Sequence, residues 1–438
     1  LNSFQKSFFS LNSLSYDSGI SSSKLIGNTI GKYFDIQVKN HSNTLALISK
    51  HQNIRWTYEQ LSARINIIAN KLITLGIRPG DRVGIWSPNN SEWTLTQLAT
   101  AKMGAILVNI NPSYQQDELQ YALNLVGCKA LILASSLKST NYIQIIQNIC
   151  PELSFSQPGQ LNSKNIPSLK YLIRIDDVST PGMLNFHDLL PFSSSTNISL
   201  KDSQESNQLQ LISSSLHFDD PINIQFTSGT TGRPKGATLT HHNILNNGFY
   251  VGEGINLKPN EKVCIPVPLY HCFGMVMGNI ACITHGATMV YPSSLYDPIE
   301  TLNTISTEQC NVIYGVPTMF ISQLEHPEFH LFNLSSLRSG ITAGSLCPSN
   351  VMKQLINKMN LREITNCYGM TELSPVCTQT KVDDTFEKKI TSVGCVHPHL
   401  ELQIVNPNYS DQENLLKFNS LDNIGNNQNN NQNNNSDN

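Results

Sequence analysis

The chain has 438 residues, which is enough for two or three domains or for one large domain with subdomains. Hydrophobic residues make up 39% of it and support a sizeable core, while the formal net charge of −3 at pH 7 argues against a nucleic-acid partner or a polybasic membrane surface. The ten cysteines contain no CxxC pair, which indicates buried thiols in a reducing compartment, and no apolar run reaches the ~18 residues of a transmembrane helix.

The first 27 residues are rich in serine and asparagine and contain two lysines but a single acid, Asp17. This composition is compatible with a mitochondrial transit peptide and equally with a plain disordered terminus. We therefore expect residues 1–27 to lie outside the globular part. We also expect a mitochondrial location, with the cytoplasm as the alternative.

Strand and helix patterns alternate along the next part of the chain. Helices are predicted at residues 61–72, 93–103 and 118–125, and strands at 82–86, 104–108 and 130–134. This alternation predicts an α/β fold with layered subdomains and a largely parallel sheet. Farther along, residues 193–215 are rich in serine and glutamine and predict a surface loop, and residues 262–268 predict another strand.

The most informative stretch is residues 222–236, INIQFTSGTTGRPKG. Apolar and polar residues alternate up to Phe226 and predict a half-buried strand, after which a loop of small and hydroxylated residues begins. The candidate ligand-binding residues of this loop are Thr227, Ser228, Gly229, Thr230, Thr231, Gly232, Arg233, Pro234 and Lys235. Its glycines let backbone N–H groups approach a ligand, its hydroxyls add donors, and Lys235 adds a mobile positive charge. Such a loop suits an oligophosphate, although its spacing is neither that of a Walker P-loop nor that of a GxGxxG dinucleotide site.

The loop is followed by a predicted second strand at residues 237–240. Thr240 is placed to cap a helix that begins at the two histidines after it.

A second motif, Asn-Cys-Tyr-Gly-Met-Thr-Glu, occupies residues 366–372. Tyr368 offers a ring on which a base can stack, and Gly369 permits a close approach of the backbone. Thr371 offers a hydroxyl to a phosphate, and Glu372 offers the hard oxygen ligand that Mg²⁺ prefers. A tyrosine–glycine turn beside an exposed glutamate is common, so this motif gains its meaning from its combination with the loop at 227–235.

Two further stretches carry weaker signals. His271 lies between aromatic residues, where a histidine is more often packed than catalytic, and the apolar residues 275–283 after it suit either core packing or the lining of an acyl tunnel. Residues 339–345, Ser-Gly-Ile-Thr-Ala-Gly-Ser, offer bare backbone on which a flat ring can lie, as many strand-to-helix loops do.

In this order, the two motifs resemble those of the adenylate-forming (AMP-binding) superfamily, which includes acyl-CoA synthetases, the adenylation domains of peptide synthetases and firefly luciferase. The segment Pro-Leu-Tyr-His-Cys-Phe-Gly-Met around His271 makes the medium-chain fatty acyl-CoA synthetases the most similar branch. The resemblance implies that residues 28–405 form the large N-terminal domain and that His271 lies near the acyl carboxylate. It also implies nucleotide contacts from Ala343, Gly344, Ser345, Asn366, Tyr368, Gly369 and Thr371.

The implied chemistry uses ATP, Mg²⁺ and coenzyme A. The carboxylate of a fatty acid attacks the α-phosphorus of ATP to give acyl-AMP, and coenzyme A then gives the thioester. Lys235, His271, Thr371 and Glu372 are the candidate catalytic residues, and Glu372 is the candidate metal ligand. The expected roles are to hold the phosphates, orient the carboxylate and neutralise developing charge.

The resemblance ends after residue 405, and residues 406–438 form an asparagine-rich stretch that is expected to be disordered. The family's Thr-Gly-Asp aspartate, hinge arginine and small C-terminal domain with its lysine have no counterpart in this sequence. We therefore expect a C-terminally truncated acyl-CoA synthetase without the small domain and with impaired activity. The alternative is an inactive nucleotide- or acyl-binding remnant of such an enzyme.

Overall fold

The computed structural model describes residues 15–190, 206–227 and 232–405. Residues 23–395 form a large unit. The described residues on either side of it belong to a separate small unit, in which β1 (Tyr16–Ser18) pairs antiparallel with β20 (Glu401–Gln403). The short strand β19 (Cys395–Val396) lies where the two units divide along the chain.

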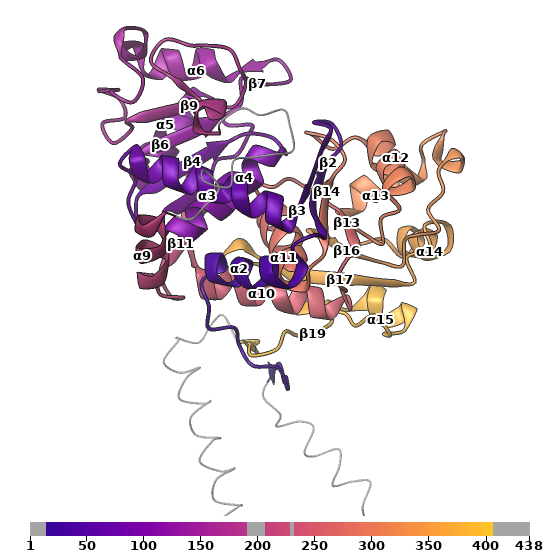
Figure 1. The fold of residues 1–438 in the computed structure, drawn as a ribbon. Coiled ribbons are helices and arrows are strands. Elements are labelled where there is room, and N and C mark those ends of the chain that lie inside the picture. Colours follow the sequence, from indigo (N-terminus) through magenta and orange to yellow (C-terminus); the bar gives the residue numbers. More distant parts are fainter. Residues whose placement is uncertain (1–14, 191–205, 228–231, 406–438) are drawn as a thin grey trace, which may run out of the picture. The chain divides into compact units, whose positions relative to one another are not determined.

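The large unit contains two main sheets (Figure 1). The strand order of the first is β10 (Leu184–Asn185), β9 (Tyr171–Arg174), β6 (Ala130–Leu133), β4 (Arg82–Trp86), β5 (Ile106–Asn109), β11 (Pro221–Thr227) and β12 (Lys235–Thr240). Neighbouring strands of this sheet are parallel except for the antiparallel pair of β11 and β12.

The second sheet contains β18 (Val376–Gln379), β17 (Glu363–Gly369), β16 (Ser339–Ala343), β15 (Val312–Gly315), β13 (Lys262–Cys264), β14 (Thr288–Tyr291), β2 (Leu45–Ser49) and β3 (Ile54–Thr57), in that order. Its central strands are parallel, and the pairs β17–β18 and β2–β3 are antiparallel. In each sheet, the carboxyl ends of several parallel strands therefore lie at the same edge of that sheet. Such edges are where α/β proteins usually bind ligands.

Helices cover the sheets in layers. The largest core cluster joins the two sheets through α2 (Ile30–His41), α3 (Tyr58–Thr74), α4 (Ser91–Met103), α10 (His241–Gly254), the π-helix η2 (Phe273–Ile280) and α11 (Ala281–His285). A second cluster lies under α5 (Gln116–Val126), α6 (Tyr142–Ile149) and the 3₁₀ helix η1 (Pro151–Phe155), and a third lies under α12 (Pro298–Glu308), α13 (Pro317–Leu324) and α14 (Ser349–Lys358). The predicted layered α/β architecture is confirmed.

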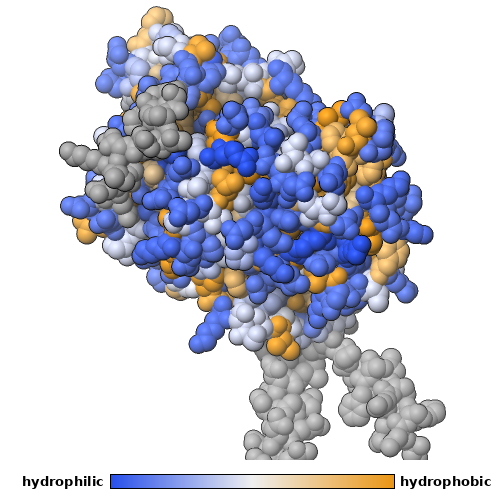
Figure 2. Space-filling model, turned by 45° about the vertical axis from the view of Figure 1, so that its right-hand side comes forward, coloured by the Kyte–Doolittle hydropathy of each residue, from blue (hydrophilic) through white to orange (hydrophobic). Residues whose placement is uncertain are grey.

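The remaining elements are short. They are the hairpin β7 (Ser136–Leu137) and β8 (Thr140–Asn141), the helices α7 (Phe186–Leu189), α9 (Asn207–Ser215) and α15 (Phe386–Thr391), and the 3₁₀ turns η3 (Phe329–Leu331) and η4 (Thr371–Leu373). None of the helices in the described ranges is long and apolar enough to cross a membrane. On the face seen in Figure 2, hydrophilic residues predominate and hydrophobic residues occur in small scattered groups.

Two predictions of local structure were wrong. The strand predicted at residues 262–268 ends at Cys264, because Pro266 and Pro268 lack the N–H group that a sheet ladder needs. The surface loop predicted at 193–215 contains α9, whose N-terminus is capped by Ser206 and which buries Leu209. The first part of that stretch, residues 193–205, lies outside the described residues.

Candidate active site

The predicted phosphate loop connects the two strands of a hairpin. Strand β11 ends at Thr227 and β12 begins at Lys235, and these two residues are directly paired in the antiparallel register. Gly232 has φ of +99°, a conformation that side-chain-bearing residues rarely adopt. Ser228, Gly229, Thr230 and Thr231 lie outside the described residues. Both ends of the loop are thus fixed by strand pairing.

The second motif lies against this hairpin. The side-chain hydroxyl of Thr227 donates a 3.0 Å hydrogen bond to Oε1 of Glu372, and the turn η4 that carries Glu372 contacts β12. Since Thr227 and Lys235 are paired, the structure brings the lysine strand and the carboxylate to one side of the hairpin. The two motifs that the sequence places far apart therefore form one site.

His271 lies at the start of a tight turn, and its Nδ1 accepts a 3.1 Å hydrogen bond from the N–H of Phe273. In the neutral ring the proton is therefore on Nε2, which can donate to a ligand oxygen. The residue as a whole is exposed to solvent. Protein packed around the imidazole nevertheless desolvates it, and this lowers the pKa of His271 below its ordinary value. His271 is consequently a neutral hydrogen-bond donor at neutral pH.

The His271 turn also adjoins the second motif. Burial is the main cause that raises the pKa of the neighbouring Cys272 thiol to about 12. A hydrogen bond with the Thr371 side chain acts in the opposite direction, and the charge of Glu372 raises the pKa further. Cys272 is therefore protonated and inert as a nucleophile. The Cys272 thiol interacts with Thr371, so the adjacent His271 lies close to the turn that carries Thr371 and Glu372.

The small-residue turn predicted to contact adenine follows β16. Ala343 is paired with Cys367 of β17, so the ends of these strands bring Ala343, Gly344 and Ser345 beside the Asn366–Gly369 segment. Gly344 has φ of +86°, which favours glycine. The Tyr368 side chain is 55% exposed, which leaves its ring accessible for stacking.

Asn366 and Gly369 of the second motif also contact nearby backbone or side chains of the protein. The backbone N–H of Asn366 donates to the hydroxyl of Thr380 at 2.8 Å. A Cβ at Gly369 would lie 1.9 Å from the carbonyl oxygen of Pro375. The requirement for glycine at 369 therefore comes from the close approach of the protein backbone at that turn.

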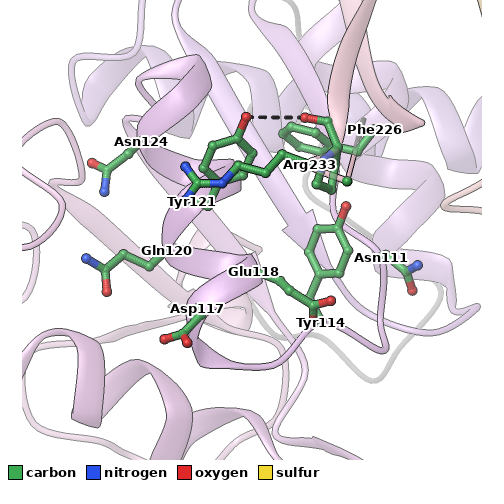
Figure 3. A pocket seen from close by; sticks show the side chains of 11 residues that line it. Asn111, Tyr114, Asp117, Glu118, Gln120, Tyr121, Asn124, Phe226 and Arg233 are labelled. Carbon is green, nitrogen blue, oxygen red and sulfur yellow. Dashed lines mark hydrogen bonds between the residues drawn. The ribbon is translucent and has the colours of Figure 1, made fainter. Parts of the chain in front are cut away.

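A cavity of about 710 Å³ opens where the loop meets α5 (Figure 3). The guanidinium of Arg233 lies 5.1 Å from the ring centroid of Tyr121, and the Tyr121 hydroxyl donates to the carbonyl of Pro234 at 3.4 Å. On the other arm of the loop, Phe226 packs against the ring of Tyr114 at 6.3 Å. Sequence analysis missed both tyrosines, because nothing in the helical pattern of α5 distinguishes a loop contact from ordinary packing.

A second cavity, of about 510 Å³, reaches the turn that leads to His271. Its lining includes Tyr270, the proline-rich segment around Pro268, and Lys138 in the hairpin of β7 and β8. Lys138 has φ of +49°. One cavity is thus lined both by a lysine and by the residue that precedes His271.

The residues present fit a magnesium ion only in combination with a nucleotide. Within residues 15–190, 206–227 and 232–405, no cluster of three histidines, cysteines or acids could hold a metal by itself. Mg²⁺ commonly takes one or two carboxylates and completes its octahedron with water and phosphate oxygens. Glu372, held by Thr227 at the mouth of the loop, is suited to that role.

Comparisons with known proteins agree with the fold and the motifs. A family profile described as "AMP-binding enzyme" matches residues 34–414. The chain is 42% identical over 395 residues to the Danio rerio protein "Medium-chain acyl-CoA ligase ACSF2, mitochondrial", a match that covers 90% of this chain and 64% of the relative. It is 43% identical over 384 residues to the "Putative acyl-CoA synthetase YngI" of Bacillus subtilis (strain 168), covering 88% of this chain and 68% of that relative. The chain thus spans roughly two thirds of the length of these relatives.

Solved structures share the fold. The inhibitor-bound N-terminal domain of FACL13 from Mycobacterium tuberculosis matches with a TM-score of 0.70 and 23% identity, covering 84% of this chain and 82% of that one. The anthranilate CoA ligase AuaEII in complex with anthranoyl-AMP also gives a TM-score of 0.70 and 23% identity, covering 85% of this chain and 65% of that one. With the family profile spanning most of the sequence and the two motifs meeting in one site, the chain belongs to the AMP-binding enzyme family.

Proposed function

We propose that this protein activates a fatty acid, of medium chain length, by converting it with ATP to an acyl adenylate and then with coenzyme A to the thioester. The observation that carries the proposal is the hydrogen bond between Thr227 and Glu372, which joins the phosphate loop to the second motif. An oligophosphate on the loop would then lie near both Lys235 and the Glu372 carboxylate. The relatives named as acyl-CoA ligases support the same reaction class.

The proposed first step needs alignment and charge neutralisation, and it needs no general base. An oxygen of the ionised carboxylate attacks the α-phosphorus, the bond to the bridging oxygen of the β-phosphate breaks, and pyrophosphate leaves with the electron pair. His271 orients the carboxylate through its Nε2–H, and Thr371 donates to the α-phosphate. Lys235 and the loop residues 227–232 hold the β- and γ-phosphates. Glu372 would hold Mg²⁺, which neutralises charge on the phosphate oxygens when bound.

We propose that coenzyme A reaches the adenylate through the cavity at Tyr270. The lining of this cavity includes Tyr270, the residue before His271, and Lys138, whose positive charge suits the phosphates of coenzyme A. The thiolate sulfur attacks the acyl carbon and AMP leaves with the electron pair of the broken C–O bond. Ala343, Gly344, Ser345, Asn366, Tyr368 and Gly369 are proposed contacts of the nucleotide.

The acyl tail is proposed to lie along η2. This helix follows His271 directly, and its apolar residues are buried. The names of the relatives favour a medium-length tail and a mitochondrial location. We propose residues 28–405 as the AMP-binding domain.

Acid-dependent exchange of labelled pyrophosphate into ATP tests the proposal directly, because it reports the first step without coenzyme A. A series of straight-chain acids from short to long is expected to give its maximum at medium length. Hydroxylamine trapping of the adenylate provides a second readout on the same samples. Binding of ATP without exchange for any acid would show that the chain is a nucleotide-binding protein and not a ligase.

A further inference from the structure

Two buried asparagines hold the turn that carries His271. Asn89 follows β4, and its amide donates to the carbonyl of Val267 at 2.9 Å while its Oδ1 accepts from the N–H of Leu269 at 2.8 Å. Asn109, the last residue of β5, donates to the carbonyl of Tyr270 at 2.9 Å. A side chain from the segment after β4 and one from the end of β5 thus fix the backbone that enters the His271 turn.

Asn109 also connects this turn to the strand that leads into the phosphate loop. Oδ1 of Asn109 accepts from the amide of Asn223 at 2.9 Å, and Oδ1 of Asn223 accepts from the amide of Gln225 at 2.9 Å. Gln225 precedes Thr227 by two positions on β11. The amides of Asn109 and Gln225 also converge on the sulfur of Met275, at 3.2 and 3.6 Å.

This network is almost entirely withdrawn from water. The exposed fractions are 4% for Asn89, 2% for Asn109, 1% for Asn223 and 3% for Gln225. Burying an amide costs free energy unless its hydrogen bonds are made, and an apolar side chain would fill the same space at no such cost. Buried polar networks whose members are satisfied can specify one arrangement of the segments they join.

The distance between strand β11 and the His271 turn matters for the proposed reaction. Strand β11 belongs to the first sheet, whereas the His271 turn follows β13 of the second sheet, so no sheet ladder fixes the distance between them. A misplacement of about 1 Å between reacting groups can reduce a rate by about 100-fold. The His271 turn itself is compact, because a Cβ at Gly274 would lie 2.4 Å from the carbonyl oxygen of Pro268.

We propose that Asn89 and Asn109 are positioning residues for acid activation: Asn109 sets the His271 turn at a fixed distance from strand β11, and Asn89 anchors the same turn to the segment after β4, so that the carboxylate and the α-phosphate meet in line. This inference rests on the proposed function for its catalytic part. Neither asparagine belongs to the proposed ATP contacts, so we expect their loss to affect the rate of the chemical step and not the affinity for ATP.

The test uses Asn109→Leu and Asn89→Leu, which keep the branched outline of the side chain and remove the amide. The matched control is Gln37→Leu, because Gln37 is also buried and donates to a backbone carbonyl, that of Thr284, outside the network. Hydrogen–deuterium exchange of peptides covering residues 265–276 is measured first. Pyrophosphate exchange follows, with KM for ATP and KM for the acid determined separately.

Both asparagine variants are expected to take up deuterium faster than wild type in the His271 turn. The Gln37→Leu control is expected to take it up at the wild-type rate. The rate of the exchange reaction at saturating substrates falls about 10- to 100-fold, while KM for ATP changes by less than about 2-fold. Should a leucine variant fail to fold, Met275→Leu removes the sulfur acceptor of Asn109 and Gln225 and is expected to give a smaller increase in deuterium uptake. This uptake is read without substrate, because Met275 lies in η2, where the acyl tail is proposed to lie.

Unchanged deuterium uptake in the turn would overturn the inference, and so would faster uptake with a reaction rate equal to that of the control. A wild-type chain without pyrophosphate exchange would instead contradict the proposed function. In that case deuterium uptake still decides whether the two asparagines hold the turn.

Discussion

The Thr227 hydroxyl donates to the Glu372 carboxylate at 3.0 Å across 145 positions of sequence. A single side-chain bond thus links the last residue of β11 to the turn η4. Burial is the main reason that the pKa of the Cys272 thiol is raised, and the Glu372 carboxylate adds to this effect, so its charge acts on the His271 turn. Three segments that sequence analysis identified separately therefore share one electrostatic environment.

Glu372→Gln is expected to reduce the rate of pyrophosphate exchange by ~100-fold and to raise the Mg²⁺ concentration needed for half-maximal rate. Glutamine keeps an oxygen that can accept from Thr227, but it lacks the charge that Mg²⁺ prefers. The measurement is a titration with Mg²⁺ at fixed ATP.

The control for this variant is Glu387→Gln, an exposed residue of α15. It should leave the Mg²⁺ dependence unchanged. If Glu372→Gln gave the same Mg²⁺ titration as wild type, Glu372 would not be a metal ligand.

Tyr121→Leu is expected to raise KM for ATP by about 2- to 5-fold, because the Arg233 guanidinium loses the ring that it lies over. Tyr121→Phe keeps the ring and removes only the long hydrogen bond to Pro234, so a smaller increase is expected. Since Tyr121 is partly exposed, neither change should reduce the yield of folded protein. Equal KM values for wild type and both variants would show that α5 does not position the loop.

Local structure could be predicted from the sequence where residues close together in the chain determine it. Thr240 is the N-cap of α10 as predicted, with its hydroxyl accepting from the N–H of Asn243 at 3.1 Å. The strand–loop–strand pattern around Lys235 is confirmed at both ends. These features depend on neighbouring residues, so the sequence contains the information that decides them.

The relations between distant segments could not be read from the sequence. Asn89 and Asn109 occur in Pro-Asn-Asn and Asn-Ile-Asn-Pro, which are typical of turns, and nothing there indicates that they are buried and hold another segment. The hydrogen bond between Thr227 and Glu372 likewise depends on how two sheets pack. Only the structure supplies such long-range pairings.

Lys138→Asn is expected to raise KM for coenzyme A by about 2- to 5-fold in thioester formation, as the loss of one exposed charge predicts. Asparagine tolerates the positive φ at this position, so the hairpin should keep its shape. Pyrophosphate exchange should stay at the wild-type rate, because coenzyme A takes no part in it. The control is the exposed Lys164→Asn, and an equal KM in both variants would show that the cavity at Tyr270 does not admit coenzyme A.

His241 makes the stability of the protein dependent on pH. Its ring is fully buried at the start of α10, and its Nδ1 accepts from the N–H of Ile30 at 3.2 Å. Burial lowers the pKa of His241 to about 4, below the 6.5 of the unfolded chain. Between these two pH values the unfolded chain binds a proton at His241 that the folded protein does not bind. The contribution of His241 to the free energy of unfolding is therefore fully present above about pH 6.5 and decreases as the pH falls toward about 4.

His241→Gln keeps an oxygen that can accept from Ile30 and removes the titrating ring. We expect the free energy of unfolding, measured by urea denaturation, to fall less between about pH 7 and about pH 5 in this variant than in wild type. The full contribution of the ring is on the order of 3 kcal/mol, because each pKa unit corresponds to about 1.4 kcal/mol. Some dependence should remain, since the pKa values of His51, His271 and His397 are also lowered by burial. The exposed His330→Gln serves as control and should follow wild type. If His241→Gln lost as much stability on acidification as that control, the buried ring would not be the group that resists protonation.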